Sequence, residues 1–293
     1  MHQPLSRPLS DRVCLVTGGA GGIGWALTQA LAQRGAYVEV ADHAQHHLDR
    51  AAKDIAGSPL EDRITLTRLD VRDRHSLEQW ISGIHAAHHR IDVLVHNAAF
   101  IRWADVADMS VEDQEASMRV GYDALVHTVK AVLPLMRRSA HGHIVAMGSS
   151  VGRVYVRGPS AAYCATKAAI EAYTEILRLE LSGSGIDVTL VRPAAVTGTD
   201  FFATHVDSTR MPRIADFLPP TTPAKVATAI TRAITHRQRV VDIPRYLPWI
   251  YHAYALAPQL TQTLMGIGGA GHRDYALQAP KQHARAARRK GRA

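Results

Sequence analysis

A tyrosine and a lysine lie four positions apart in the segment AAYCATKAAI, which spans residues 161–170. On a helix this spacing places Tyr163 and Lys167 on one face, one turn apart. A positive charge beside a phenol favours the phenolate and lowers its pKa from the ordinary value of about 10, which suits acid–base chemistry. Packing explains such a pair equally well, because pairs of this kind arise by chance in long helices. The rest of the chain must decide between the two.

A glycine-rich segment, TGGAGGIG, occupies residues 17–24 between a predicted strand and a predicted helix. Gly18, Gly22 and Gly24 allow a tight turn and, with Ile23, let a pyrophosphate approach the N terminus of the helix. Because the segment follows the first strand of the chain, it predicts a nucleotide site rather than an ordinary turn.

Carboxylates end the next two predicted strands. Asp42 lies 18 residues after Gly24, where it can accept both ribose hydroxyls of an adenosine and would repel a 2′-phosphate. His43 rather than an arginine follows it, so NAD is predicted over NADP; a helix cap is the alternative role for Asp42. Asp70 and Val71 close the third strand and could border the adenine, with turn formation as the alternative.

Short β-branched segments alternate with segments of helical length through most of the chain. This alternation predicts an α/β fold, with a doubly wound, parallel seven-stranded sheet in a single domain. We expect strands at residues 12–17, 37–41, 64–68, 92–97, 143–147, 187–191 and 240–243. We expect helices at residues 23–34, 44–56, 76–89, 111–138 and 162–182.

The composition fits one large domain, with 293 residues of which 46% are apolar. Its two cysteines predict neither a disulfide framework nor a zinc site, and they fit a reducing cytoplasm. The 17 histidines are scattered without acidic partners, so no metal site is predicted. Six charges of the net +8 belong to residues 281–293, a basic tail expected to be disordered, and nucleic-acid binding is not expected. Residues 1–10 form a short lead without the apolar core of a secretory signal.

Residues 10–245 resemble the short-chain dehydrogenase/reductase family. The resemblance is carried by TGGAGGIG (17–24), Asp70-Val71, HNAA (96–99), MGSS (147–150), YCATK (163–167) and RPAAVTGTDF (192–201), in this order and spacing. It implies a Rossmann-type sheet with strand order 3-2-1-4-5-6-7 in a catalytic domain of residues 11–245. It also implies hydride transfer between a nicotinamide ring and an alcohol or carbonyl.

The same resemblance assigns the catalytic groups. Tyr163 would be the general acid–base, and Lys167 would lower its pKa together with the nicotinamide and would hold the nicotinamide ribose. A serine would orient the substrate oxygen: counting along the strand from Gly142 indicates Ser149, whereas counting back from Tyr163 indicates Ser150. The strand count has more weight, because a strand has a fixed rise per residue.

Further cofactor contacts are implied near the ends of the fourth and sixth strands. Asn97 and Ala98 would border the cofactor, and the backbone from Pro193 to Val196 would meet the nicotinamide carboxamide. Thr199 would contact the diphosphate.

Three positions depart from the family pattern. Gly121 replaces an asparagine that holds a water linking the lysine to solvent, which leaves a space that a water could fill. Ala99 and Ala194 replace glycines near the expected cofactor, and each adds a methyl group.

The segments after the sixth and seventh strands concern the substrate and partners. Residues 199–220 are the expected substrate lid, where an apolar pocket and simple packing are equally supported for Phe201, Phe202, Met211 and Phe217.

Residues 246–280 form a C-terminal extension, and its part 246–272 contains no Asp, Glu, Lys or Arg. This extension could contact a subunit, cover the substrate cleft, or lie on an anionic membrane together with the basic tail. The resemblance also implies a homodimer or homotetramer through the fourth and fifth helices.

The sequence therefore predicts an NAD-dependent oxidoreductase acting on a hydrophobic secondary alcohol or ketone. The alternative, which the three departures motivate, is a catalytically weak NAD-binding sensor or scaffold that could associate with a membrane.

Overall fold

Parallel strands and crossover helices make up the computed structural model, which describes residues 9–199, 201, 210, 213, 216 and 220–267. The strands are β1 (Val13–Thr17), β2 (Tyr37–Asp42), β3 (Ile64–Arg68), β4 (Val93–His96), β5 (Gly142–Met147), β6 (Ile186–Pro193) and β7 (Val240–Ile243). They form one parallel sheet in the order β3-β2-β1-β4-β5-β6-β7. The expected fold class and strand order are confirmed.

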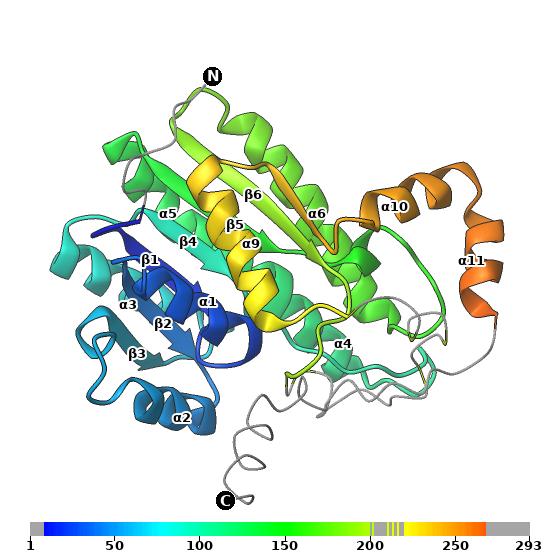
Figure 1. The fold of residues 1–293 in the computed structure, drawn as a ribbon, viewed down its shortest axis with the longest axis horizontal. Coiled ribbons are helices and arrows are strands. Elements are labelled where there is room, and N and C mark those ends of the chain that lie inside the picture. The colour runs from blue at the N-terminus through cyan, green and yellow to red at the C-terminus, as the bar shows by residue number, and fades with distance from the viewer. Residues whose placement is uncertain are drawn as a thin grey trace, which may run out of the picture.

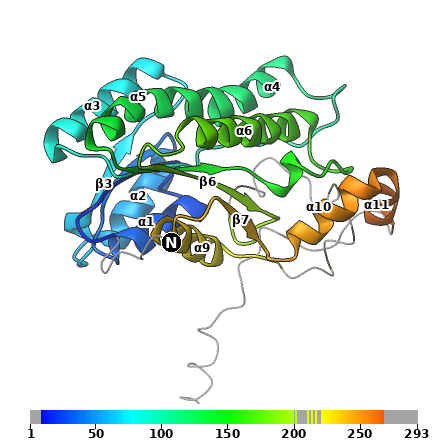
Figure 2. The ribbon, with the colours of Figure 1, turned by 90° about the horizontal axis from the view of Figure 1, so that it is seen from above.

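The helices cover the sheet in two layers, with α1, α2 and α9 on one face and α3, α4, α5 and α6 on the other (Figures 1 and 2). Their bounds are α1 (Gly22–Ala32), α2 (Gln45–Ile55), α3 (Arg74–His88), α4 (Val111–Met118), α5 (Ala124–Ser139), α6 (Ala161–Glu180), α9 (Pro223–His236), α10 (Leu247–Leu256) and α11 (Pro258–Gly266). The single helix expected at residues 111–138 is divided, because a π-helical turn, Arg119–Asp123, joins α4 to α5.

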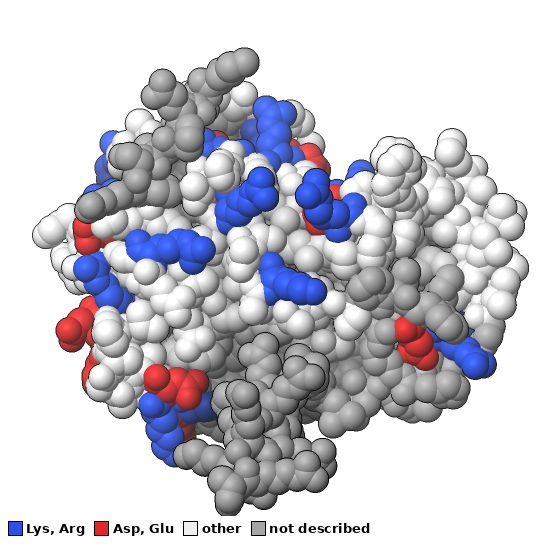
Figure 3. Space-filling view, in the orientation of Figure 1, with Lys and Arg blue, Asp and Glu red and all other residues white. Residues whose placement is uncertain are grey.

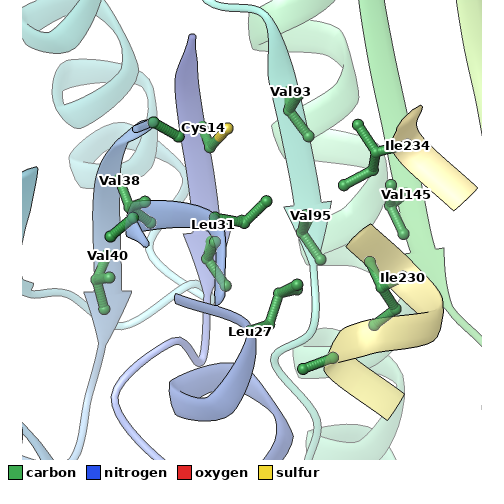
Figure 4. Close-up of a cluster of buried hydrophobic side chains, with 14 of the residues drawn as sticks. Cys14, Leu27, Leu31, Val38, Val40, Val93, Val95, Val145, Ile230 and Ile234 are labelled. Atoms are coloured by element: carbon green, nitrogen blue, oxygen red, sulfur yellow. The ribbon is translucent and has the colours of Figure 1, made fainter. Parts of the chain in front are cut away.

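The core lies on both faces of the sheet, as a parallel sheet covered by helices requires. On the α1 face, Val95 and Val145 of the sheet pack with Leu27 of α1 and Ile230 of α9 (Figure 4). Burying each such side chain contributes about 1.5–3 kcal/mol. The packed sheet is therefore a rigid platform for the loops at its edge.

All strands run in one direction, so their carboxyl ends meet at one edge. The chain order reverses at β1, which lies between β2 and β4. In doubly wound sheets, ligands bind in the crevice at this point.

Helices α10 and α11 extend from the end of β7 as a separate lobe (Figure 1). Its surface at the upper right of Figure 3 is uncharged, because residues 246–267 contain no Asp, Glu, Lys or Arg. Among the described residues, no helix combines the length and apolarity needed to cross a membrane.

Candidate active site

A cavity of about 800 Å³ lies at the carboxyl edge of the sheet. Its lining contains the expected site residues Gly18, Gly22, Ile23, Asp42, Asp70, Val71, Asn97, Ala98, Ser149, Ser150, Tyr163, Lys167, Pro193, Val196 and Thr199. Gly24 is not part of the lining and instead lies against the backbone of Gly18 in the glycine loop. One cavity thus brings together residues from seven separate segments of the chain.

The glycine loop has a geometry that excludes side chains. Gly18 and Gly22 have φ angles of +61° and +51°, in the left-handed region that favours glycine. A Cβ on Gly24 would lie 2.0 Å from the carbonyl oxygen of Gly18. Asn97 donates a hydrogen bond from Nδ2 to the same oxygen at 2.8 Å. Since Gly21 caps α1 without a side chain, the N terminus of this helix stays open to an anion.

Thr199 indicates what that anion could be. Its hydroxyl is buried and has no hydrogen-bond partner among the described residues. Its Cγ2 methyl would lie 3.3 Å from a Cβ on Gly22, so the side chain borders the glycine loop. Buried hydroxyls are normally paired, and a diphosphate oxygen at the loop would pair this one. The residues present therefore fit a dinucleotide cofactor.

Asp42 ends β2 with a nearly buried carboxylate. Its oxygens accept hydrogen bonds from the N–H of Ala20 at 3.1 Å and of Ala44 at 3.0 Å. Burial raises the pKa of Asp42, but hydrogen bonds from His47, Ala44 and Ala20 outweigh burial and hold this pKa below its ordinary value. An ionised carboxylate has about four acceptor sites, so Asp42 can still accept ribose hydroxyls.

Asp70 has the turn function that was its alternative role. Its carboxylate accepts hydrogen bonds from the backbone N–H of Arg72 at 3.0 Å and from the Arg72 guanidinium at 2.6 Å. Val71 beside it is buried and lines the cavity.

Tyr163 and Lys167 lie one turn apart on α6, which begins after the capping side chain of Ser160. The Tyr163 phenol is 9% exposed and is hydrogen-bonded with Ser149. Ser149 is buried at the end of β5, whereas Ser150 begins a short 3-10 turn. The geometry therefore places Ser149, rather than Ser150, against the phenol.

Burial dominates the electrostatics of the pair in the absence of the nicotinamide. Burial raises the pKa of Tyr163 above its ordinary value, and the hydrogen bond from Ser149 lowers it only in part. Nζ of Lys167 donates to the carbonyl of Met147 at 2.8 Å and lies 5.5 Å from the Tyr163 ring centroid. Burial also lowers the pKa of Lys167 to about 8.

The expected space beside Gly121 is not present. A Cβ on Gly121 would lie only 2.4 Å from Cγ2 of Thr166, so the threonine methyl already fills the position of the missing side chain. The expectation of a vacated space for a water is therefore wrong at this position.

A buried histidine that sequence reasoning missed holds the π-helical turn. His96 donates from Nε2 to the carbonyl of Gly121 at 3.1 Å, and its Nδ1 lies 3.2 Å from Oγ1 of Thr17. Burial and the nearby charge of Lys167 lower the pKa of His96 to about 4, which keeps it neutral. The only sequence signal was a polar residue within the fourth apolar strand.

The other end of the cavity is apolar. Its walls include Ile101, Trp103, Val154, Val156, Phe201, Tyr246, Leu247, Ile250, Tyr251 and Met265. Phe201 lies 6.1 Å from Tyr163, measured between ring centroids. Phe202, Met211 and Phe217 lie outside the described residues. Several of these wall residues come from α10 and α11. A cover over the substrate cleft was one of the alternatives left open for the uncharged stretch 246–272.

A buried ion-pair cluster anchors α10 over this apolar end. The guanidinium of Arg192 pairs with both carboxylate oxygens of Asp242, at 2.7 and 2.9 Å, and with Glu171 at 3.0 Å. Its Cζ lies 4.8 Å from the ring centroid of Tyr251 on α10, within the range of a cation–π interaction. The cluster thus ties α10 to β6, β7 and α6.

Comparisons with known proteins identify a family and relatives similar to this chain. The family profile described as short chain dehydrogenase matches residues 12–209. The chain is 34% identical over 188 residues to the 3-oxoacyl-[acyl-carrier-protein] reductase FabG of Thermotoga maritima, a match covering 64% of this chain and 75% of the relative. It is 35% identical over 190 residues to the NADP-dependent 3-hydroxy acid dehydrogenase YdfG of Escherichia coli K12, covering 64% of this chain and 74% of the relative.

Solved structures share the fold. The closed form of serine dehydrogenase complexed with NADP+ superposes with a TM-score of 0.69 at 30% identity, covering 79% of this chain and 94% of that one. A short-chain dehydrogenase/reductase from Burkholderia phymatum in complex with NAD has a TM-score of 0.75 at 21% identity, covering 87% and 96%.

Proposed function

The chain belongs to the short-chain dehydrogenase/reductase family, and from that premise we propose that it transfers hydride between NAD and a hydrophobic secondary alcohol or ketone. The observation that carries the proposal is the meeting of Tyr163, Ser149 and Lys167 between the glycine loop and the apolar end of one cavity. As a member of this family the protein is an oxidoreductase acting on CH–OH groups.

In the oxidation direction, the substrate hydroxyl lies between Tyr163 and Ser149. Ser149 orients the substrate oxygen, and Tyr163 accepts the hydroxyl proton as the carbinol hydrogen leaves with its electron pair. The nicotinamide, when bound, supplies the hydride acceptor and a positive charge that favours the phenolate. Lys167 holds the ribose hydroxyls one helical turn away. In the reduction direction Tyr163 donates its proton to the carbonyl oxygen.

The preference for NAD rests on Asp42. Its ionised carboxylate at the end of β2 favours free ribose hydroxyls and repels a 2′-phosphate. The YdfG relative is named as NADP-dependent, so cofactor choice must be measured on this chain.

The decisive experiment compares wild type with Tyr163→Phe by NADH formation over a panel of secondary alcohols and sterols. We expect wild-type turnover, and a loss of about 10²- to 10⁴-fold in the variant because the proton acceptor is removed. NAD affinity should be retained. Tyr173→Phe is the matched control, since it makes the same change on α6 away from the cavity. Equal turnover in Tyr163→Phe would contradict the assigned role, and NAD binding without wild-type turnover would favour the sensor alternative.

We further propose that the lobe of α10 and α11 rests on an anionic lipid surface, while the enzyme itself works in the cytoplasm. Trp249, Leu256 and Leu260 are 79%, 87% and 59% exposed, and the basic segment 281–293 follows them in the chain. Apolar side chains beside basic residues suit such a surface.

This contact is tested by sedimentation with vesicles. The protein should pellet with phosphatidylglycerol–phosphatidylcholine vesicles and not with phosphatidylcholine alone. Trp249→Ser with Leu256→Ser should release it, whereas Val106→Ser, at another exposed apolar residue, should not. Equal binding to both kinds of vesicle would count against the charge-based contact.

Self-association is proposed through α5 and α6. Ile176 and Leu179 on α6 are 55% and 71% exposed, as expected for an unpaired helix face. Light scattering of Leu179→Glu should show a smaller particle than wild type, and a monomeric wild type would refute this assembly.

A further inference from the structure

His96 is a buried polar residue at the carboxyl end of β4, behind the lining of the cavity rather than in it. Its ring has a partner on each side. Nε2 lies 3.1 Å from the carbonyl oxygen of Gly121 in the π-helical turn, and Nδ1 lies 3.2 Å from Oγ1 of Thr17 at the end of β1. The next two residues, Asn97 and Ala98, line the cavity. His96 therefore stands between the π-helical turn and the cavity wall.

The carbonyl of Gly121 determines which ring nitrogen of His96 carries the proton. A carbonyl oxygen only accepts, so Nε2 must donate to it. Burial and the nearby charge of Lys167 lower the pKa of His96 to about 4, so the ring is neutral at neutral pH and its Nδ1 is an acceptor. The hydroxyl of Thr17 must therefore donate to Nδ1.

This direction also fixes the two acceptor positions of the Thr17 oxygen. A hydroxyl has one proton to donate and two lone pairs that accept. With its proton given to His96, the oxygen accepts hydrogen bonds from the backbone N–H of Asn97 and of Ala98, each at 3.2 Å. Asn97 in turn donates from Nδ2 to the carbonyl of Gly18 at 2.8 Å. One chain of hydrogen bonds thus runs from the π-helical turn to the glycine loop.

We infer that His96 is a positioning residue for the dinucleotide, because it directs the Thr17 hydroxyl and so holds the backbone of Asn97 and Ala98 in the wall of the cofactor site. The inference rests on the proposed function, since it requires a dinucleotide between the glycine loop and the end of β4. Without an acceptor at Nδ1 the hydroxyl can turn, and its lone pairs no longer face both backbone N–H groups. The wall then loosens, which weakens cofactor binding but leaves the proton transfer at Tyr163 intact.

Two substitutions separate the two halves of this bridge. The side-chain amide of asparagine reaches the position of Nδ1, whereas that of glutamine reaches the position of Nε2, and each amide can donate or accept. His96→Asn therefore keeps an acceptor for the Thr17 hydroxyl and loses the donor to Gly121. His96→Gln keeps the donor to Gly121 and loses the acceptor for Thr17.

Isothermal titration calorimetry with NAD and steady-state kinetics on the full chain compare the two variants. His96→Gln should raise Kd and KM for NAD by about 3- to 10-fold, the equivalent of one hydrogen bond. Its kcat at saturating NAD should stay unchanged, because only binding is weakened. His96→Asn should keep a Kd for NAD close to that of wild type. Thr17→Val removes the hydroxyl and keeps the shape, so it should match His96→Gln, and the double variant should bind no more weakly than either.

His143→Gln is the matched control. His143 is also a buried histidine in the sheet, its Nε2 lies 2.7 Å from Oγ1 of Thr189, and it does not line the cavity. The same substitution there should leave Kd for NAD unchanged. Thermal melting of every variant separates a loss of stability from a loss of positioning, because a purely structural role of His96 would lower Tm without distinguishing His96→Gln from His96→Asn in NAD binding.

The inference would be overturned by equal dissociation constants for His96→Gln and His96→Asn, by wild-type NAD binding in Thr17→Val, or by an equal effect of His143→Gln. If His96→Gln does not fold, Thr17→Val alone decides, since it breaks the same chain from its other side. A wild-type protein that does not bind NAD would be a different result, because it would refute the proposed function as well.

Discussion

Gly121 and Thr166 share one small space between the π-helical turn and α6. The threonine methyl occupies the position of a Cβ on residue 121, while its hydroxyl donates to the carbonyl of Ala162 at 2.8 Å and lies 3.1 Å from Ser117 Oγ. The sequence shows Gly121 as a departure from the family pattern, but not its compensation. That compensation depends on how closely two distant segments approach, which no local pattern contains.

A double-mutant cycle tests this pairing. Gly121→Ala should lower the free energy of unfolding by about 1–3 kcal/mol, because the added methyl overpacks the contact with Thr166. Thr166→Ser removes the clashing methyl and keeps the hydroxyl, so it should restore most of the loss in the double variant. Urea denaturation measures both. Gly83→Ala in α3 is the control, since nothing lies within 4 Å of its added Cβ. Additive losses would show that the two residues do not share the space.

At the scale of elements, the sheet was predictable and the lobe was not. Each strand is a short β-branched segment, and alternation with helices determines that the strands are parallel. The division of the helix at residues 111–138 escaped prediction, because a π-helical turn adds no distinctive residue. For the uncharged stretch 246–272 the sequence left open a subunit contact, a cover of the substrate cleft or an interfacial helix on an anionic membrane. The structure shows that α10 covers the cavity, because Leu247, Ile250 and Tyr251 line it and Tyr251 packs against Arg192.

The ion-pair cluster that anchors α10 leads to a testable prediction at this scale. Arg192→Lys keeps one charge but loses the two-point pairing with Asp242 and the stacking on Tyr251. We expect a several-fold higher KM for bulky apolar substrates with little change in kcat for small alcohols. The reason is that the α10 residues that line the cavity would no longer be held in position. Steady-state kinetics on both substrate classes measure the difference. Arg232→Lys, exposed on α9, is the matched control, and an equal effect of both variants would refute the anchoring role.

At the scale of the whole molecule, two buried histidines link stability to pH. Burial and the charge of Lys167 lower the pKa of His96 to about 4, and burial lowers the pKa of His143, which lies 2.7 Å from Oγ1 of Thr189, to about 3. In the unfolded chain both have ordinary values of 6.5. Below pH 6.5 these two histidines therefore bind protons in the unfolded chain but stay neutral in the folded chain.

Stability should be highest above pH 6.5 and should fall on acidification. Each histidine removes about 1.4 kcal/mol of unfolding free energy per pH unit between pH 6.5 and 4. Urea denaturation at pH 7, 6 and 5 measures this slope. His143→Gln should remove about half of the contribution from the pair, whereas His252→Gln, an exposed histidine, should leave the slope unchanged. A His143→Gln slope identical to that of wild type would contradict the buried-histidine account.

The site is also ordered along the chain, and this order has a consequence for synthesis on the ribosome. The proposed adenosine side comes from the loop 18–24, Asp42 and Asp70, while Tyr163 and Thr199 follow much later and the lobe comes last. Strands β1 to β3, which carry or precede these residues, are complete by residue 68. The segments of the proposed nucleotide-binding surface are therefore synthesised first, those of the proposed catalytic groups second, and the apolar wall of the cavity from α10 and α11 last.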